Sequence, residues 1–119
     1  MKRQAIFTER ELDVMDILWE RGSGTVAEVQ ERIADELAYT TVLTVLRTLE
    51  TKGYVGHEPE GRAYRYYPLV ERKEAQESHL DRLLSKLFSG SPELLLTQLV
   101  KQREITPRER DRLRKLLGD

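Results

Sequence analysis

Hydrophobic residues recur at helical spacing in the stretch from Ala38 to Gly53. The apolar positions follow the order i, i+3, i+4, i+7, which is the spacing of one face of an α-helix. They are Val42, Val45, Leu46 and Leu49. The pattern therefore predicts a helix, and Gly53 stands where a glycine in the left-handed conformation would end it.

The face opposite these apolar residues is rich in threonine. A solvated helix face more commonly carries Glu, Lys, Gln or Ala, because β-branched threonine loses side-chain freedom in a helix. Short hydroxyl and methyl groups beside an arginine suit contact with base edges, thymine methyls and phosphates in a major groove. We hypothesise a DNA recognition helix; the alternative is a solvated face of low helix propensity. The residues of this face are Thr40, Thr41, Thr44, Arg47, Thr48 and Thr51.

Two capping boxes predict helices before this stretch. Thr8 and Glu11 have the spacing at which each side chain bonds the backbone amide of the other residue, and Thr25 and Glu28 repeat it. Apolar residues follow each box at helical spacing. They are Leu12, Met15, Leu18 and Trp19 in the first helix, and Val26, Val29, Ile33 and Leu37 in the second.

After Gly53 the pattern changes to that of strands. Residues 54–58 and 63–67 are rich in β-favouring residues, and Pro59, Glu60 and Gly61 between them predict a turn. Three short helices followed by a hairpin are typical of a winged helix-turn-helix. In that fold the third helix enters the major groove. Arg62, just past the predicted turn, is therefore a candidate phosphate or minor-groove contact.

The C-terminal third carries three amphipathic helical patterns, with starts near Val70, Pro92 and Thr106. About fifty residues make a marginal independent core, so we expect the leucines to pack against a second copy of the chain. The alternative is a monomer in which these helices pack on the N-terminal part. The candidate dimerisation residues are Leu80, Leu83, Leu84, Leu87, Leu95, Leu96, Leu99, Leu113, Leu116 and Leu117.

The predicted fold class is thus mainly α with a small β component. We expect a winged-helix DNA-binding domain at residues 1–70 and a helical dimerisation region at residues 71–119. A two-fold dimer would place two recognition helices on the two half-sites of a palindrome.

Composition limits the kinds of partner and chemistry. The net charge is −1, with −3 in residues 1–70 and +2 in residues 71–119, so a DNA-binding surface must be a local basic patch. The absence of cysteine excludes disulfides and zinc–thiolate sites and fits a reducing cytoplasm. We find no apolar leader and no membrane-length run, and we expect no membrane insertion.

No motif points to catalysis or to a cofactor. The chain lacks phosphate-binding, nucleophile-elbow and metalloprotease motifs, and its two histidines, His57 and His79, lie far apart in sequence. We therefore expect no enzyme activity, no metal site and no cofactor. The hairpin tyrosines could stack on bases, but aromatic residues in a short hairpin more often form its packing face.

The order of the motifs resembles the penicillinase-repressor family of bacterial transcriptional regulators (the BlaI/MecI/CopY type). The resemblance covers nearly the whole chain and implies a homodimeric repressor of a palindromic operator. It implies base contacts at Thr40, Thr41 and Thr44, with Thr48 next along, and a wing contact near Arg62. The segments that carry it are residues 8–12, 14–15, 18–19, 39–42, 44–46, 49, 52–55, 57, 61–62, 64, 66–70 and 105–117.

The chain departs from the family pattern in two places. Copper-sensing members end in a cysteine cluster, which is absent here, so a copper–thiolate mechanism is not available. Penicillinase repressors are cleaved at an Asn-Phe bond in the dimerisation region, and the best match here is Gln98-Leu99. A membrane-bound sensor protease as a partner is thus implied by the family resemblance, and no feature of the sequence itself supports it independently.

Together these observations predict a transcriptional repressor that binds double-stranded DNA with sequence specificity. Arg47, Lys52 and Arg62 would supply affinity for phosphates, and the threonines would read base edges and methyls. The alternative is a winged-helix module that binds protein and never reads DNA, which the acidic balance of the N-terminal part favours.

Overall fold

The structure is a computed structural model that describes residues 4–118. It divides into two compact units, Met1–His79 and Leu80–Asp119. Helix α4 (Arg72–Leu87) contributes residues to both. The functional boundary expected at residue 70 remains a prediction.

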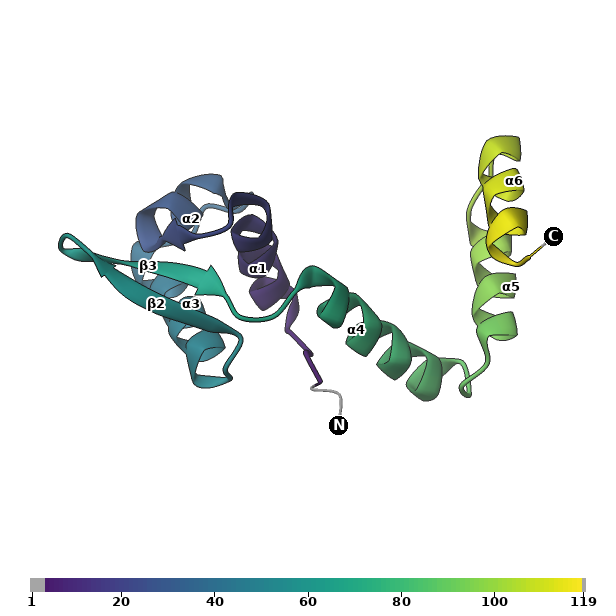
Figure 1. Ribbon diagram of the computed structural model, residues 1–119, viewed down its shortest axis with the longest axis horizontal. Coiled ribbons are helices and arrows are strands. Elements are labelled where there is room, and N and C mark those ends of the chain that lie inside the picture. The colour runs from purple at the N-terminus through teal and green to yellow at the C-terminus, as the bar shows by residue number, and fades with distance from the viewer. Residues whose placement is uncertain (1–3, 119) are drawn as a thin grey trace. The chain divides into compact units, whose positions relative to one another are not determined.

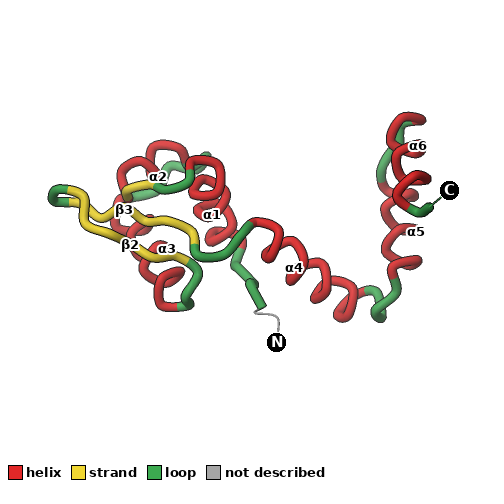
Figure 2. Tube along the Cα trace, viewed as in Figure 1, coloured by secondary structure: helices red, strands yellow, loops and turns green. Residues whose placement is uncertain are grey.

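The first unit is a winged helix-turn-helix, as the hydrophobic pattern predicts (Figure 1). Its three strands form one antiparallel sheet in the order β1-β3-β2 (Figure 2). The fold class is therefore confirmed as mainly α with a small sheet. Its elements are α1 (Glu9–Arg21), β1 (Gly24–Thr25), α2 (Val26–Arg32), α3 (Tyr39–Thr51), β2 (Val55–Glu60) and β3 (Ala63–Pro68).

Both predicted capping boxes are formed. The amide of Glu11 donates to Thr8 Oγ1 at 3.1 Å, and the amide of Thr8 donates to Glu11 Oε1 at 2.7 Å. Thr25 and Glu28 make the same two bonds at the start of α2. Each box satisfies amide groups that have no partner inside the helix, which is why these helices begin where they do.

The second helix is shorter than its apolar pattern predicts. We expected a buried stripe continuing to Leu37, but α2 ends at Arg32 and Ile33 is extended. Gln30 Nε2 donates to the Leu37 carbonyl oxygen at 2.9 Å and closes the connection to α3. Leu37 still packs against the core, so its apolar character reflects tertiary burial and not helical periodicity.

The turn of the hairpin begins two residues later than expected, and of the three predicted turn residues only Gly61 lies in it. Pro59 and Glu60 belong to β2, opposite Tyr64 and Ala63, and the turn consists of Gly61 and Arg62. Gly61 has φ +61°, a conformation that glycine adopts without strain. Pro59 is tolerated because β2 is an edge strand, where a missing amide donor costs little.

The core of the first unit lies where the three helices meet the sheet. Full burial of a large apolar side chain contributes about 1.5–3 kcal/mol. The apolar face of α3 is part of this core, so the threonine-rich face is left outside. The largest fully buried side chains are Met15, Leu18, Leu46, Leu49, Val14, Val29, Val42 and Val55.

The N-terminal segment before α1 fastens the start of α4. The amide of Ala5 donates to Ser78 Oγ at 3.0 Å, and the amide of Phe7 donates to His79 Nε2 at 3.1 Å. The buried ring of Phe7 packs against Tyr54 with ring centroids 4.6 Å apart. The first two turns of α4 therefore belong to the winged-helix unit.

The second unit contains the end of α4 together with α5 (Pro92–Gln102) and α6 (Pro107–Leu116). Ser91 caps α5, and Thr106 and Glu109 form a third capping box at α6. Neither α5 nor α6 has a buried residue. No helix within residues 4–118 combines the length and apolar content needed to cross a bilayer.

Candidate nucleic-acid interface

Helix α3 buries one apolar face and exposes a face rich in threonine. Val42, Leu46 and Leu49 have no exposed surface, whereas every candidate base-reading threonine is exposed. The exposed residues are Thr40, Thr41, Thr44, Arg47 and Thr48. The structure therefore brings five of the seven candidate DNA-contacting residues together on one helix.

Two threonine hydroxyls of α3 bond to the helix backbone. The Thr44 hydroxyl donates to the Thr40 carbonyl oxygen at 2.9 Å, and the Thr51 hydroxyl donates to the Arg47 carbonyl oxygen at 3.0 Å. Because Thr44 uses its hydrogen in this bond, its side chain offers a methyl group and oxygen lone pairs to a neighbour. Thymine methyls and base amino groups in a major groove are complementary to those groups.

Lys52 lies at the C-cap of α3 and is engaged within the protein. Its Nζ donates to Glu11 Oε2 at 2.8 Å, and the Glu11 side chain is only 5% exposed. Burial of the Glu11 carboxyl raises its pKa, but hydrogen bonds from Lys52 and Thr8 and the Lys52 charge outweigh this effect. The pKa of Glu11 is therefore below its ordinary value of 4.5.

The hairpin is fastened to the helices through Arg65 of β3. Its guanidinium bonds Glu28 at the start of α2 at 3.0 Å and Glu60 of β2 at 2.7 Å. A further bond, at 3.2 Å, reaches Ser23 Oγ. The bond from Arg65, followed by the bond from the Thr25 amide, lowers the pKa of Glu28. Arg65 therefore anchors the wing, while Arg62 lies exposed in the turn at its tip.

Two exposed aromatic residues adjoin this surface and were not among the predicted site residues. Tyr39 begins α3 beside Thr40, and Tyr64 of β3 packs its ring against His57 with centroids 4.6 Å apart. His57 in turn pairs with Glu50 of α3. The neighbouring Tyr66 is buried, so the packing-face interpretation describes Tyr66 and does not describe Tyr64. In the sequence, the one indication that Tyr39 adjoins the candidate DNA-binding surface is its position next to Thr40.

A family model described as penicillinase repressor matches residues 7–119. The chain belongs to the penicillinase repressor family. A transcriptional regulator BlaI of Mycobacterium tuberculosis is 37% identical over 110 residues, covering 89% of this chain and 78% of that protein. A penicillinase repressor of Bacillus licheniformis is 24% identical over 121 residues, covering 100% of this chain and 94% of that protein.

Solved structures of this family resemble the winged-helix unit. The DNA-binding domain of the repressor BlaI matches with a TM-score of 0.54 and 29% identity, over 62% of this chain and 93% of that one. The B. licheniformis BlaI monomeric form in complex with the blaP half-operator matches with a TM-score of 0.53, 29% identity and the same coverage. The oxidised form of MarR from E. coli, at 18% identity and a TM-score of 0.54, shares the fold.

The leucines expected to dimerise this penicillinase-repressor chain are largely solvent-exposed. Leu84 and Leu95 are half-buried and the other eight are exposed, with Leu116 at 82% and Leu117 at 73%. Leu94 and Val100 are also exposed and were not among the predicted dimerisation residues. Gln98 and Leu99, the expected cleavage position, lie inside α5 with exposed side chains.

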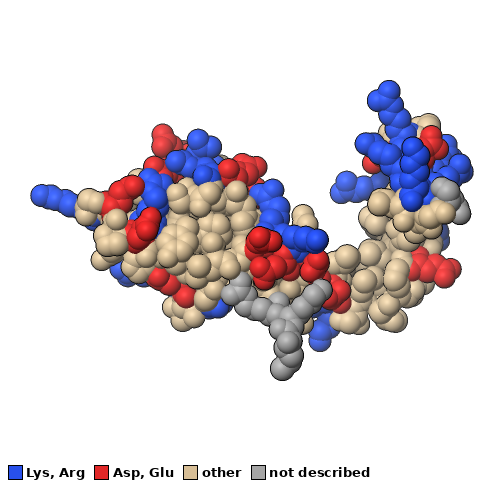
Figure 3. Space-filling model, viewed as in Figure 1, with Lys and Arg blue, Asp and Glu red and all other residues tan. Residues whose placement is uncertain are grey.

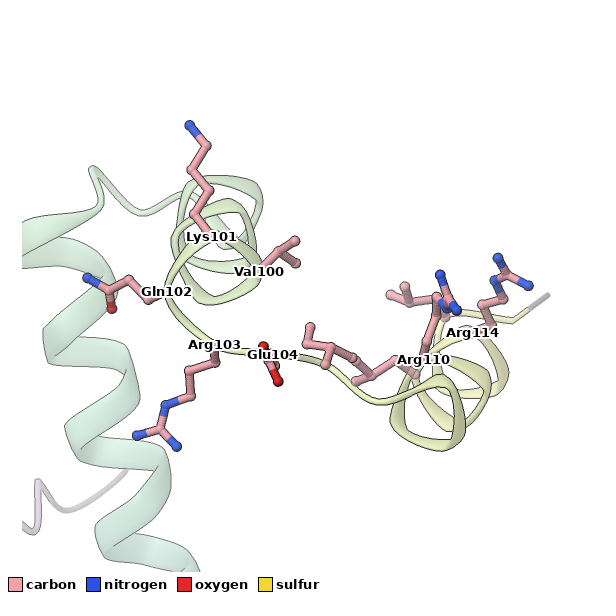
Figure 4. Close-up of a pocket in the computed structure, with 10 residues that line it drawn as sticks. Val100, Lys101, Gln102, Arg103, Glu104, Arg110 and Arg114 are labelled. Atoms are coloured by element: carbon pink, nitrogen blue, oxygen red, sulfur yellow. The ribbon is translucent and has the colours of Figure 1, made fainter.

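A groove of about 540 Å³ lies between the end of α5 and α6. Val100 points from α5 toward α6, whereas Lys101 points away from it (Figure 4). The lining combines apolar Ile105, Leu113 and Leu117 with Arg110 and other cations. Lys and Arg side chains gather over α6 on the face seen in Figure 3.

The lowered pKa of Glu11 predicts that acid reduces the stability of the fold through this residue. In the unfolded chain its pKa is ordinary, so the ionised carboxylate stabilises the fold above pH 4.5 and this contribution is lost as the pH falls through the lowered pKa. Glu11→Gln should cost about 1.5–3 kcal/mol at pH 7, because it removes a hydrogen bond to a charged group. The cost should shrink toward pH 3. Urea unfolding of both proteins at each pH measures it, and an equal cost at both pH values would contradict the prediction.

Proposed function

We propose that this chain is a transcriptional repressor that binds a palindromic DNA operator as a homodimer. The observation that carries the proposal is that α3 exposes its threonine face while Val42, Leu46 and Leu49 on the opposite face are fully buried. Each protomer would insert α3 into a major groove and lay its wing over the adjacent backbone. Membership of the penicillinase repressor family, and the half-operator complex of a relative, support DNA as the ligand.

The proposed interface divides its work between two kinds of side chain. Arg47 on α3 and Arg62 at the wing tip would neutralise phosphates, which supplies affinity without sequence preference. Thr40, Thr41, Thr44 and Thr48 would contact base edges and methyl groups, which supplies sequence preference. Phosphates respond mainly to nearby charges, because salt screens charges more than about 8–10 Å away, so a local pair of cations is compatible with the acidic balance of the first unit.

The exposed leucines of the second unit support dimerisation. Large exposed apolar surfaces in a soluble chain mark sites of association. We propose that a second copy covers Leu80, Leu83, Leu84, Leu87, Leu95, Leu96, Leu99, Leu113, Leu116 and Leu117. A two-fold axis through this contact would match the symmetry of a palindromic operator.

Release of the operator by proteolysis is part of the proposal. Cleavage between Gln98 and Leu99 by a membrane-bound sensor protease would remove the end of α5 and all of α6, with Val100, Leu113, Leu116 and Leu117 among the lost apolar residues. The loss of these side chains would weaken the dimer. Because the bond lies inside a helix, the protease would require local unwinding of α5, and the absence of buried residues there makes unwinding inexpensive.

DNA binding is tested by fluorescence anisotropy on the duplex upstream of the chain's own gene, with a scrambled duplex of equal length, across a series of salt concentrations. We expect tighter binding to the native duplex and a steep fall of affinity with salt, because binding releases counterions.

Arg47→Gln should weaken binding to both duplexes and reduce the salt slope by about one. Arg72→Gln, which removes a cation paired with Asp16, is the control and should leave the slope unchanged. Weak, equal binding of both duplexes would favour the protein-binding alternative.

Base reading by Thr44 is tested by two substitutions of different chemistry. Thr44→Val keeps a methyl group in place and removes the hydroxyl oxygen, whereas Thr44→Ala removes both. We expect Thr44→Ala to cost about 1–3 kcal/mol on the native duplex and to change sequence preference. Retention by Thr44→Val would assign the contact to the methyl group. If Thr44→Ala left both affinity and preference intact, Thr44 would not be a base-reading residue.

Dimerisation is tested by sedimentation velocity at micromolar concentration. The unaltered chain should sediment as a dimer, and the double variant Leu116→Asp, Leu117→Asp should sediment as a monomer, because two carboxylates cannot be buried without partners. Leu69→Asp, at an exposed leucine of the first unit, is the matched control and should remain dimeric. A monomeric unaltered chain would remove the basis for a palindromic operator.

A further inference from the structure

Glu11 is the one buried carboxylate among residues 4–118. Its two oxygens have different partners. Oε1 accepts the Thr8 amide at 2.7 Å and closes the capping box of α1, and Oε2 accepts Lys52 Nζ at 2.8 Å from the end of α3. A single side chain therefore joins the start of α1 to the end of the proposed recognition helix.

The capping box alone does not account for the burial of Glu11. Glu109 makes the same bonds to Thr106 at the start of α6 while remaining exposed. A buried carboxylate is costly unless it is paired, and Lys52 supplies the pairing charge. If Lys52 turned to a DNA phosphate, it would leave Glu11 buried and unpaired. The geometry therefore opposes the phosphate-binding role that the sequence suggested for Lys52.

The two ends of α3 are held differently. At its N-terminus Ala38 provides no side-chain cap. At its C-terminus Lys52 bonds Glu11, and the next residue, Gly53, turns the chain toward β2 with φ +83°. A cation at this end also interacts favourably with the helix dipole. The bond between Lys52 and Glu11 therefore restrains α3 at the end from which the chain continues into the wing.

We propose that Glu11 and Lys52 are positioning residues for DNA reading, which set the orientation of the threonine face of α3 and do not themselves bind phosphate. This inference rests on the proposed function. A positioning pair affects contacts that require accurate geometry, namely those with base edges. A phosphate ligand affects all sequences alike and changes the number of counterions released.

The test uses the full-length chain with Lys52→Gln, Glu11→Gln and both together. Glutamine at position 11 has one acceptor oxygen and one donor amide, whereas both of its partners are donors, so one of the two bonds must be lost. Affinity for the native and scrambled duplexes is measured by anisotropy across salt concentrations, after circular dichroism has shown that each variant is folded. Arg47→Gln is the matched comparison for loss of a phosphate contact.

We expect each single variant to weaken binding to the native duplex about tenfold, while binding to the scrambled duplex and the salt slope stay as in the unaltered chain. The double variant should be no weaker than the single ones, because each substitution by itself already removes the charge pair. Lys52→Arg, which can still pair with Glu11, should bind like the unaltered chain. If Glu11→Gln fails to fold, the Lys52 variants decide, since Lys52 is 42% exposed and its replacement leaves no cavity.

Two results would overturn the inference while leaving the proposed function standing. One is a salt slope reduced by about one in Lys52→Gln, with both duplexes weakened, which would make Lys52 a phosphate ligand. The other is unchanged native-duplex affinity in Lys52→Gln. An unaltered chain that does not prefer the native duplex would overturn both proposals, and this failure is recognised before any variant is made.

Discussion

The burial of one face of α3 is the constraint on which the rest of the structure depends. Val42, Leu46 and Leu49 are completely removed from solvent, so the helix has a single stable rotation about its own axis. That rotation leaves the threonines and Arg47 outside. The apolar contact restrains the helix without using any group of the polar face, and the bond between Glu11 and Lys52 adds a polar restraint at one end.

Two capping glutamates of the first unit have a second role. Glu11 and Glu28 each use one oxygen to close a helix N-terminus, and each carboxylate also accepts a bond from a distant cation. Glu11 joins α1 to Lys52 at the end of α3, and Glu28 joins α2 to Arg65 in the wing. The two elements proposed to contact DNA, α3 and the hairpin, are thus tied to the helices that begin with capping boxes. Charged ties of this kind are directional, which apolar packing is not.

The second unit follows a different principle. Its helices have well-formed starts, with Ser91 capping α5 and a complete capping box at α6, yet neither helix buries a residue. Local bonds can specify where a helix begins, but they do not provide a core. If a second chain supplies that core, as proposed, the folding of this part is linked to association.

The sequence by itself determined the features that depend on near neighbours. These features are the capping boxes, the apolar stripe of α3, the glycine that ends it and the aromatic strands of the wing. Each is formed by residues that lie close together in sequence, so its pattern can be recognised from the sequence alone. The winged helix-turn-helix and the threonine face followed from them. Local patterns predicted the boundaries of elements less well. Leu37 packs against the core although α2 ends at Arg32, and the hairpin turn is formed by Gly61 and Arg62.

Only the tertiary structure decided the contacts between distant residues. Strand β1 has two residues and exists because β3 lies beside it. Glu11 and Lys52 are 41 positions apart, and Glu28 and Arg65 are 37 apart, so no periodicity connects them. The sequence alone predicted that Lys52, a cation at the end of the proposed recognition helix, binds phosphate. The fold placed a buried carboxylate beside it, because the packing of α1 against α3 brings the start of one helix to the end of the other.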